Sequence, residues 1–257
     1  MAVVGLEKFK EYFLSFKENY VIIGGTACSI MLRDTDMKPR TTKDIDMILI
    51  IEKMTPEFGK QFWKFIEDGK YATRERKRDE GKGPTPELFR FLKPKTKGFP
   101  IQIELLSKQP DVIEVPEGFH LVPIPVDEDV PSLSAILMDE ELYNFVLTHI
   151  VTENELPIAD LYGLICLKVK AYLNLSKQVP SARSSDIKKH MTDVFKLMAG
   201  GEVSEPIDLS DYMKTDISTF VEKMEKLLPN QPLQDSIQRN EEFVRQILEE
   251  IKQIFRL

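Results

Sequence analysis

Two short apolar segments near the N-terminus place polar residues at the ends of expected strands. Tyr20 to Ile23 is a β-rich run that stops at Gly24-Gly25, and a buried helix is expected from Thr26 onward. Residues 44–51 read DIDMILII and predict a second strand, with hardly a polar residue beyond its two aspartates. The order strand, paired glycines, helix, strand predicts an α+β fold with a mixed sheet flanked by helices.

The two aspartates of the second strand form a candidate metal site. Side chains two residues apart on a strand point to the same face, so Asp44 and Asp46 lie side by side. Two neighbouring ionised carboxylates repel each other unless a cation lies between them, and Mg²⁺ accepts one or two carboxylates together with substrate phosphates. A solvated pair at a strand edge is the alternative, and it explains most isolated D-x-D sequences.

A third carboxylate lies in a later expected strand, 99–106. Its alternation places Gln102 and Glu104 on one face and Ile101, Ile103 and Leu105 on the other. Glu104 is therefore a candidate third ligand for a site with two metal ions, although by itself it equally suits a solvent-facing strand position.

The paired glycines form a candidate phosphate site. Glycines at a strand-to-helix junction allow a phosphate to approach the backbone, and the first N–H groups of the helix, at Thr26 and Ala27, bind anions. A plain tight turn explains most isolated Gly-Gly pairs. The combination with Asp44, Asp46 and Glu104 is more specific than any of its parts.

The rest of the chain divides into two regions, with domains expected at 1–152 and 153–257. The first region should contain helices at 6–20 and 55–69, a polar turn at 34–39, a strand at 88–92 and short strands between 112 and 151. Apolar residues three and four apart predict helices at 158–175, 185–199, 210–228 and 235–255, which form a helical C-terminal domain.

Composition limits the function classes. The chain has 257 residues, a net charge of −7 and two cysteines, which are expected to be packing residues. The longest apolar runs are too short to cross a membrane and the N-terminus lacks the features of a secretory signal, so a cytoplasmic location is expected.

The charge distribution is uneven. Residues 70–98 hold ten Lys or Arg against four Asp or Glu, a net of +6, so the remainder carries −13. The basic loop at 74–97 is either solvated or a guide for an anionic acceptor such as tRNA.

The run GGTACSIMLRDTDMKPRTTKDIDMIL resembles the signature of nucleotidyltransferases of the DNA polymerase β superfamily, and among them the AbiEii-type abortive-infection toxins. In that family a GGTA segment precedes an R-x-T-x-D-I-D stretch, which is Arg40 to Asp46 here. The segment 167–171 resembles the family's K-L-x-A element and 189–193 its K-D-x-x-D element. Two departures are the 18 residues between Gly25 and Asp44 and the presence of His190 where the family has Asp.

The resemblance implies a nucleotidyltransferase fold and a reaction that moves a nucleotide from an NTP to an acceptor hydroxyl of RNA, tRNA or protein, in a toxin that has a cognate antitoxin. It implies two Mg²⁺ ions held by Asp44, Asp46 and Glu104, with Glu104 also a candidate base and Lys168 a catalytic residue. The residues that it implies for nucleotide binding are Gly24, Gly25, Thr26, Arg40, Thr42, Lys168 and Lys189. The alternative to an enzyme is a non-catalytic module that binds nucleotide or a partner on the same fold.

The two lysines of the helical region also have structural explanations. Lys168 lies on an apolar helical stripe, where its stem could pack while its amine reaches water, or its amine could face a phosphate. Lys189 shares a helix face with Asp186 and Asp193, which favours a surface salt-bridge cluster over ligand contact.

Overall fold

A mixed β-sheet is the centre of the N-terminal region. The computed structural model describes residues 3–76, 85–109, 121–124, 133–177, 184–203 and 205–257. Its strands are β1 (Tyr20–Ile23), β2 (Asp44–Leu49), β3 (Ala72–Arg76), β4 (Thr85–Leu92), β5 (Gln102–Ser107), β6 (Leu121–Ile124), β7 (Leu133–Leu137), β8 (Ile150–Glu153) and β9 (Leu156–Ala159).

The described strands form one sheet in the order β3-β4-β5-β2-β1-β9-β8, and β7 pairs with both β5 and β6. The central pairs β2–β5 and β1–β9 are parallel, whereas β1–β2 and β4–β5 are antiparallel. This arrangement is the predicted mixed sheet.

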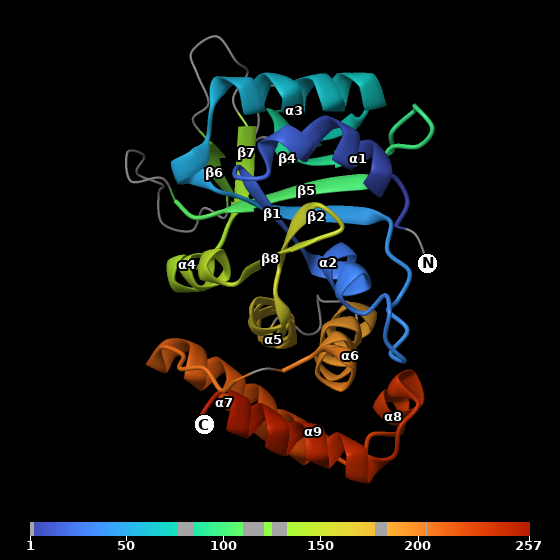
Figure 1. Cartoon of the computed structure of the whole chain (residues 1–257), viewed down its shortest axis with the longest axis vertical. Helices are drawn as coiled ribbons and strands as arrows, with labels where there is room; N and C mark the ends of the chain where they lie inside the picture. The colour runs from blue at the N-terminus through green and yellow to red at the C-terminus, as the bar shows by residue number, and fades with distance from the viewer. Residues whose placement is uncertain (1–2, 77–84, 110–120, 125–132, 178–183, 204) are drawn as a thin grey trace. The chain divides into compact units, whose positions relative to one another are not determined.

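Helices cover both faces of this sheet (Figure 1). On one face lie α1 (Leu6–Phe13) and α3 (Pro56–Gly69), and on the other lie α2 (Gly24–Met31) and α4 (Glu140–Thr148). Aromatic side chains fill the first face, because Phe62 and Trp63 of α3 both contact the ring of Phe91 on β4. Thr55 caps α3 by accepting from the amide of Phe58 at 3.2 Å, which confirms the predicted start of that helix.

A second compact unit contains residues 30–39 and 160–257, whereas the first contains 1–29 and 40–159. The helices of the second unit are α5 (Leu161–Lys177), α6 (Ser184–Gly200), α7 (Asp211–Leu227), α8 (Gln231–Ile237) and α9 (Glu241–Ile254). The predicted polar turn at 34–39 belongs to it: a Cβ on Gly200 of α6 would contact Leu32, Thr35 and Met37. The expected domain boundary, after residue 152, falls within β8.

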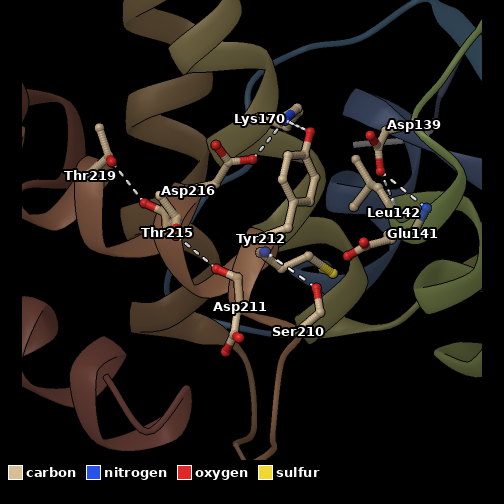
Figure 2. Close-up of polar contacts among 11 residues, drawn as sticks. Asp139, Glu141, Leu142, Lys170, Ser210, Asp211, Tyr212, Thr215, Asp216 and Thr219 are labelled. Atoms are coloured by element: carbon tan, nitrogen blue, oxygen red, sulfur yellow. Dashed lines mark hydrogen bonds and ion pairs between the residues drawn. The ribbon is translucent and has the colours of Figure 1, made fainter.

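Polar contacts join helices within this second unit (Figure 2). The Lys170 amine of α5 lies 2.7 Å from the Asp216 carboxylate of α7 and also contacts the Tyr212 hydroxyl. Ser210 caps α7 by accepting from the amide of Met213. Within the first unit, Asp139 caps α4 in the same way.

Several predicted elements are wrong in extent. The first helix ends at Phe13 and a 3-10 turn, Leu14–Phe16, follows it. Ile158 does not begin a helix but pairs with Ile22 in the sheet, and the helix predicted at 235–255 is two helices separated at Gln238, which has a left-handed backbone.

Two further predictions differ from the structure. Of the segment 112–151, where short strands and turns were expected, the described part contains the strands β6 and β7 and the start of β8, but it also contains the helix α4, which was not predicted. Part of the predicted basic loop is strand, since β3 pairs with β4, while 77–84 lies outside the described residues. Among the helices that the structure describes, each is too short or too polar to cross a membrane.

Candidate active site

The candidate site lies on the face of the sheet opposite α3. Because residues paired across neighbouring strands share a face, the registers Ile45–Ile103 and Ile103–Phe91 place these three apolar side chains together on the α3 side. The alternating residues Asp44, Asp46 and Glu104 consequently lie on the other face, where all three are half-buried.

Pairing of β2 with β5 places the three predicted carboxylates on one face of the sheet. Asp46 is directly in register with Glu104, and Asp44 with Gln102. Neighbouring strands are about 4.8 Å apart, so Glu104 lies next to Asp46 on the same face. The sequence indicated the face on which each residue lies, but only the structure gives this register.

The glycine pair lies against polar side chains of the same unit. Gly24 has φ of +69°, and a Cβ at this position would collide with the carboxylate of Asp46. A Cβ on Gly25 would lie 2.9 Å from both the Arg40 guanidinium and the Thr42 hydroxyl. The structure therefore brings Gly24, Gly25, Arg40, Thr42 and Asp46 together at one end of β2.

Thr26 has a structural contact that the sequence did not reveal. Its side chain is completely buried, and its hydroxyl donates a 2.6 Å hydrogen bond to the backbone carbonyl of Asp44. This bond ties the first turn of α2 to the start of β2. Because the Thr26 hydroxyl already donates to the Asp44 carbonyl, only the backbone N–H of Thr26 could make the predicted contact with a phosphate.

Arg90 belongs to the site but was not predicted. It lies directly opposite Glu104 in the β4–β5 register, and its Nε donates to Glu104 Oε1 at 2.8 Å, with Nη2 in contact with the same oxygen. The alternation Phe89-Arg90-Phe91 already indicated that Arg90 points away from the aromatic core. Its partner could not be found from sequence, since it depends on how two distant strands align.

The donor set fits a magnesium ion at Asp44 and Asp46. Both are half-buried carboxylates on one strand face, and Mg²⁺ typically takes one or two carboxylates in addition to phosphate oxygens and water. Across the described part of the chain, no three Asp, Glu, His or Cys side chains form a cluster that is ready to hold a metal ion. Glu104 instead interacts with Arg90.

The two predicted lysines lie in the second unit. Lys168 on α5 is buried and its amine donates a 2.6 Å hydrogen bond to Asp193 of α6, so the amine does not reach water as the snorkelling interpretation requires. Lys189 forms a half-exposed ion pair with Asp186 at 3.0 Å, one turn away on the same helix, which confirms that part of the salt-bridge interpretation. Asp193 does not lie in a surface cluster as predicted, because it is buried and pairs with Lys168. A nucleotide contact for either lysine stays a prediction.

Comparison with known proteins gives little further identification. No protein-family model matches the chain, and no curated protein matches it. Among solved structures, an antigenic nucleotidyltransferase-like protein from Paracoccidioides brasiliensis is similar to this chain. The match covers 93% of this chain and 96% of that protein's chain, at 13% sequence identity and a TM-score of 0.41.

Proposed function

We propose that this chain is a magnesium-dependent nucleotidyltransferase of the DNA polymerase β superfamily. The observation that carries the proposal is the register of β2 with β5, which places Asp46 beside Glu104 on the face where Asp44 and the Gly24-Gly25 turn also lie. The family resemblance of the segment 24–46 supports the same activity, and the AbiEii-type assignment depends on that resemblance alone.

In the proposed reaction an acceptor hydroxyl attacks the α-phosphorus of an NTP. A new phosphorus–oxygen bond forms to the acceptor, the bond to the β-phosphate oxygen breaks, and pyrophosphate leaves. Magnesium bound at Asp44 and Asp46 would stabilise the charge that develops on the attacking and leaving oxygens.

The remaining residues bind and orient the donor. The backbone at Gly24 and Gly25 allows close approach of a triphosphate to the amides that open α2, and the nearby Arg40 guanidinium supplies positive charge. Thr42 offers a hydroxyl at the same place. Once Glu104 has separated from Arg90, its carboxylate takes the proton from the attacking hydroxyl.

The biological setting follows from the resemblance: a cytoplasmic toxin paired with an antitoxin, acting on tRNA, another RNA or a protein. Residues 74–97 contribute positive charge for an anionic acceptor, although 77–84 lie outside the described residues.

Transfer of label from an α-labelled NTP tests the activity. The full chain is incubated with each NTP, Mg²⁺ and a cell extract that supplies acceptors, and we expect labelled RNA or protein. A double variant, Asp44→Asn with Asp46→Asn, should lose the transfer, whereas Glu57→Gln with Glu67→Gln, on the exposed side of α3, should keep it. No transfer to any acceptor, or equal transfer by the two double variants, contradicts the proposal.

A second candidate is a module that binds nucleotide without turnover. The ion pair between Glu104 and Arg90 favours it, because the guanidinium holds Oε1 of this carboxylate and so competes with a metal ion or a proton for it. Calorimetry with Mg-NTP separates the two functions: binding heat without pyrophosphate release supports the module, and steady pyrophosphate release excludes it.

A further inference from the structure

Tyr212, the second residue of α7, is the most exposed tyrosine of the chain. All seven tyrosines lie within the described residues, and the side chain of Tyr212 is 39% exposed. The other six are buried or donate a hydrogen bond from the hydroxyl: Tyr20, Tyr143, Tyr162 and Tyr172 are buried, Tyr12 donates to Asp68, and Tyr71 donates to the carbonyl of Pro100. Tyr212 therefore offers the phenol that a large reactant can approach most easily.

An ammonium group lies against this phenol. Lys170 of α5 donates to the Tyr212 hydroxyl, lies 4.2 Å from the centre of its ring, and donates to Asp216 at 2.7 Å (Figure 2). Burial lowers the pKa of the Lys170 amine, but the hydrogen bonds to Asp216 and Tyr212 outweigh burial and raise that pKa above its ordinary value. The amine therefore stays charged at neutral pH and presents its charge to the phenol oxygen.

This arrangement suits a phenol that reacts as a nucleophile. A cation that donates to a phenol oxygen favours the ionised form, and a side chain that ionises more readily is the better nucleophile at neutral pH. Asp216, one turn along α7 from Tyr212, holds the ammonium in this position. The same ammonium would compensate the negative charge of a phosphodiester on the phenol oxygen, and the N-terminal turn of α7 adds partial positive charge.

We propose that Tyr212 is an acceptor hydroxyl for the nucleotidyl transfer, so that the protein modifies itself at this residue. The inference rests on the proposed function, because that reaction supplies the nucleotide. A bond forms between the Tyr212 oxygen and the α-phosphorus of an NTP, and the bond from this phosphorus to the oxygen that bridges to the β-phosphate breaks. Pyrophosphate leaves with the electron pair of the broken bond, and the phenolic proton passes to solvent water.

Incubation of the full chain with each α-labelled NTP and Mg²⁺, without cell extract, tests this directly. After denaturation and removal of free nucleotide, we expect label on the protein and a mass increase of one nucleoside monophosphate less water. Tandem mass spectrometry should locate the added group at Tyr212. This readout uses the wild type, so it does not depend on whether a variant folds.

Variants then test the phenol and its cation. Tyr212→Phe should lose the label, whereas Tyr12→Phe, which removes a hydroxyl from a partly exposed position of α1, should keep it. Lys170→Gln should be labelled at least about ten-fold more slowly, because a neighbouring opposite charge typically changes the ionised fraction of a group by that much or more. Lys223→Gln is the matched control, since it removes a positive charge from an exposed position of α7 about three turns from Tyr212. It should be labelled as the wild type is.

Three results would overturn the inference: label at another residue of the wild type, equal labelling of Tyr212→Phe and the wild type, or an unlabelled chain that transfers label to acceptors in a cell extract. Equal rates for Lys170→Gln and Lys223→Gln would overturn the part assigned to Lys170. Failure of the proposed function is a different result, because no label would then reach either the chain or any acceptor in the extract.

Discussion

The hydroxyl of Thr26 donates a 2.6 Å hydrogen bond to the backbone carbonyl of Asp44, across 18 residues of sequence. It fixes the first turn of α2 to the first residue of β2, and the glycine turn is thereby held beside the aspartates. The side chain of Thr26, a residue whose backbone N–H the sequence suggested for phosphate binding, thus maintains the geometry of the candidate site.

Replacing Thr26 by Val should remove this hydrogen bond while the volume of the side chain stays nearly the same. We expect the free energy of unfolding to fall by about 1–2 kcal/mol, because the Asp44 carbonyl loses its partner in a buried setting. Thr26→Ser keeps the hydroxyl and should retain more of the nucleotide transfer. Urea denaturation and the labelled-NTP assay measure both effects, and equal transfer by the two variants would contradict the positioning role.

Gly24→Ala should reduce Mn²⁺ binding at the aspartate pair. Its φ of +69° makes alanine unfavourable by roughly 1–2 kcal/mol, and the new Cβ would displace the Asp46 carboxylate. Gly98→Ala is the matched control, because Gly98 has φ of +86° but open space around the Cβ position. The control should lose stability without losing Mn²⁺ affinity, and equal Mn²⁺ binding by the two variants would argue against contact between Gly24 and Asp46.

The buried pair of Lys168 and Asp193 should be far more sensitive than the surface pair of Lys189 and Asp186. Lys168→Met leaves a buried carboxylate without its cation, which typically costs about 3–5 kcal/mol. Lys189→Met should cost less than about 1 kcal/mol, because its side chain is half-exposed.

Chemical denaturation measures the difference between these variants, and the double variant Lys168→Met with Asp193→Leu should recover much of the loss. Similar stabilities for Lys168→Met and Lys189→Met would show that the buried pair contributes no more to the free energy of unfolding than the surface pair does. Transfer activity of the stabilised double variant then reports separately on the predicted nucleotide contact of Lys168.

Glu52 lies just after the end of β2 and should make the free energy of unfolding depend on pH. Burial raises the pKa of its carboxyl, but hydrogen bonds from Lys108, from the backbone amide of Glu52 itself and from Tyr143 outweigh burial and hold that pKa below its ordinary value. A carboxyl with a lowered pKa in the folded state stabilises the protein above its unfolded pKa, and this contribution is lost as the pH falls through the folded value. Glu52→Gln should therefore melt at a lower temperature than the wild type at neutral pH.

The difference between Glu52→Gln and the wild type should shrink as the pH falls below about 4. Glu57→Gln, at an exposed position of α3, should show no comparable difference. A constant gap between Glu52→Gln and the wild type at every pH would mean that the charge of Glu52 is not the cause. Thermal melts over a series of buffers provide the measurement.

The sequence by itself determined features that depend on near neighbours. The cap at Thr55, the strand that stops at Gly24 and the alternation around Glu104 follow from hydrogen bonds and side-chain directions within a few residues. The same local rules failed where tertiary contacts competed. Ile158 has a place in an apolar helical pattern, but its pairing with Ile22 makes it part of the sheet.

Only the tertiary structure decided which polar groups meet. Arg90, Glu104 and Asp46 come from three strands separated by long stretches of chain, and their contacts depend on the registers of β4 with β5 and of β5 with β2. Lys168 likewise meets Asp193 only because α5 packs against α6. Strand alternation specifies the face on which a residue lies, whereas register arises from burying that face against the rest of the protein, which no local sequence pattern encodes.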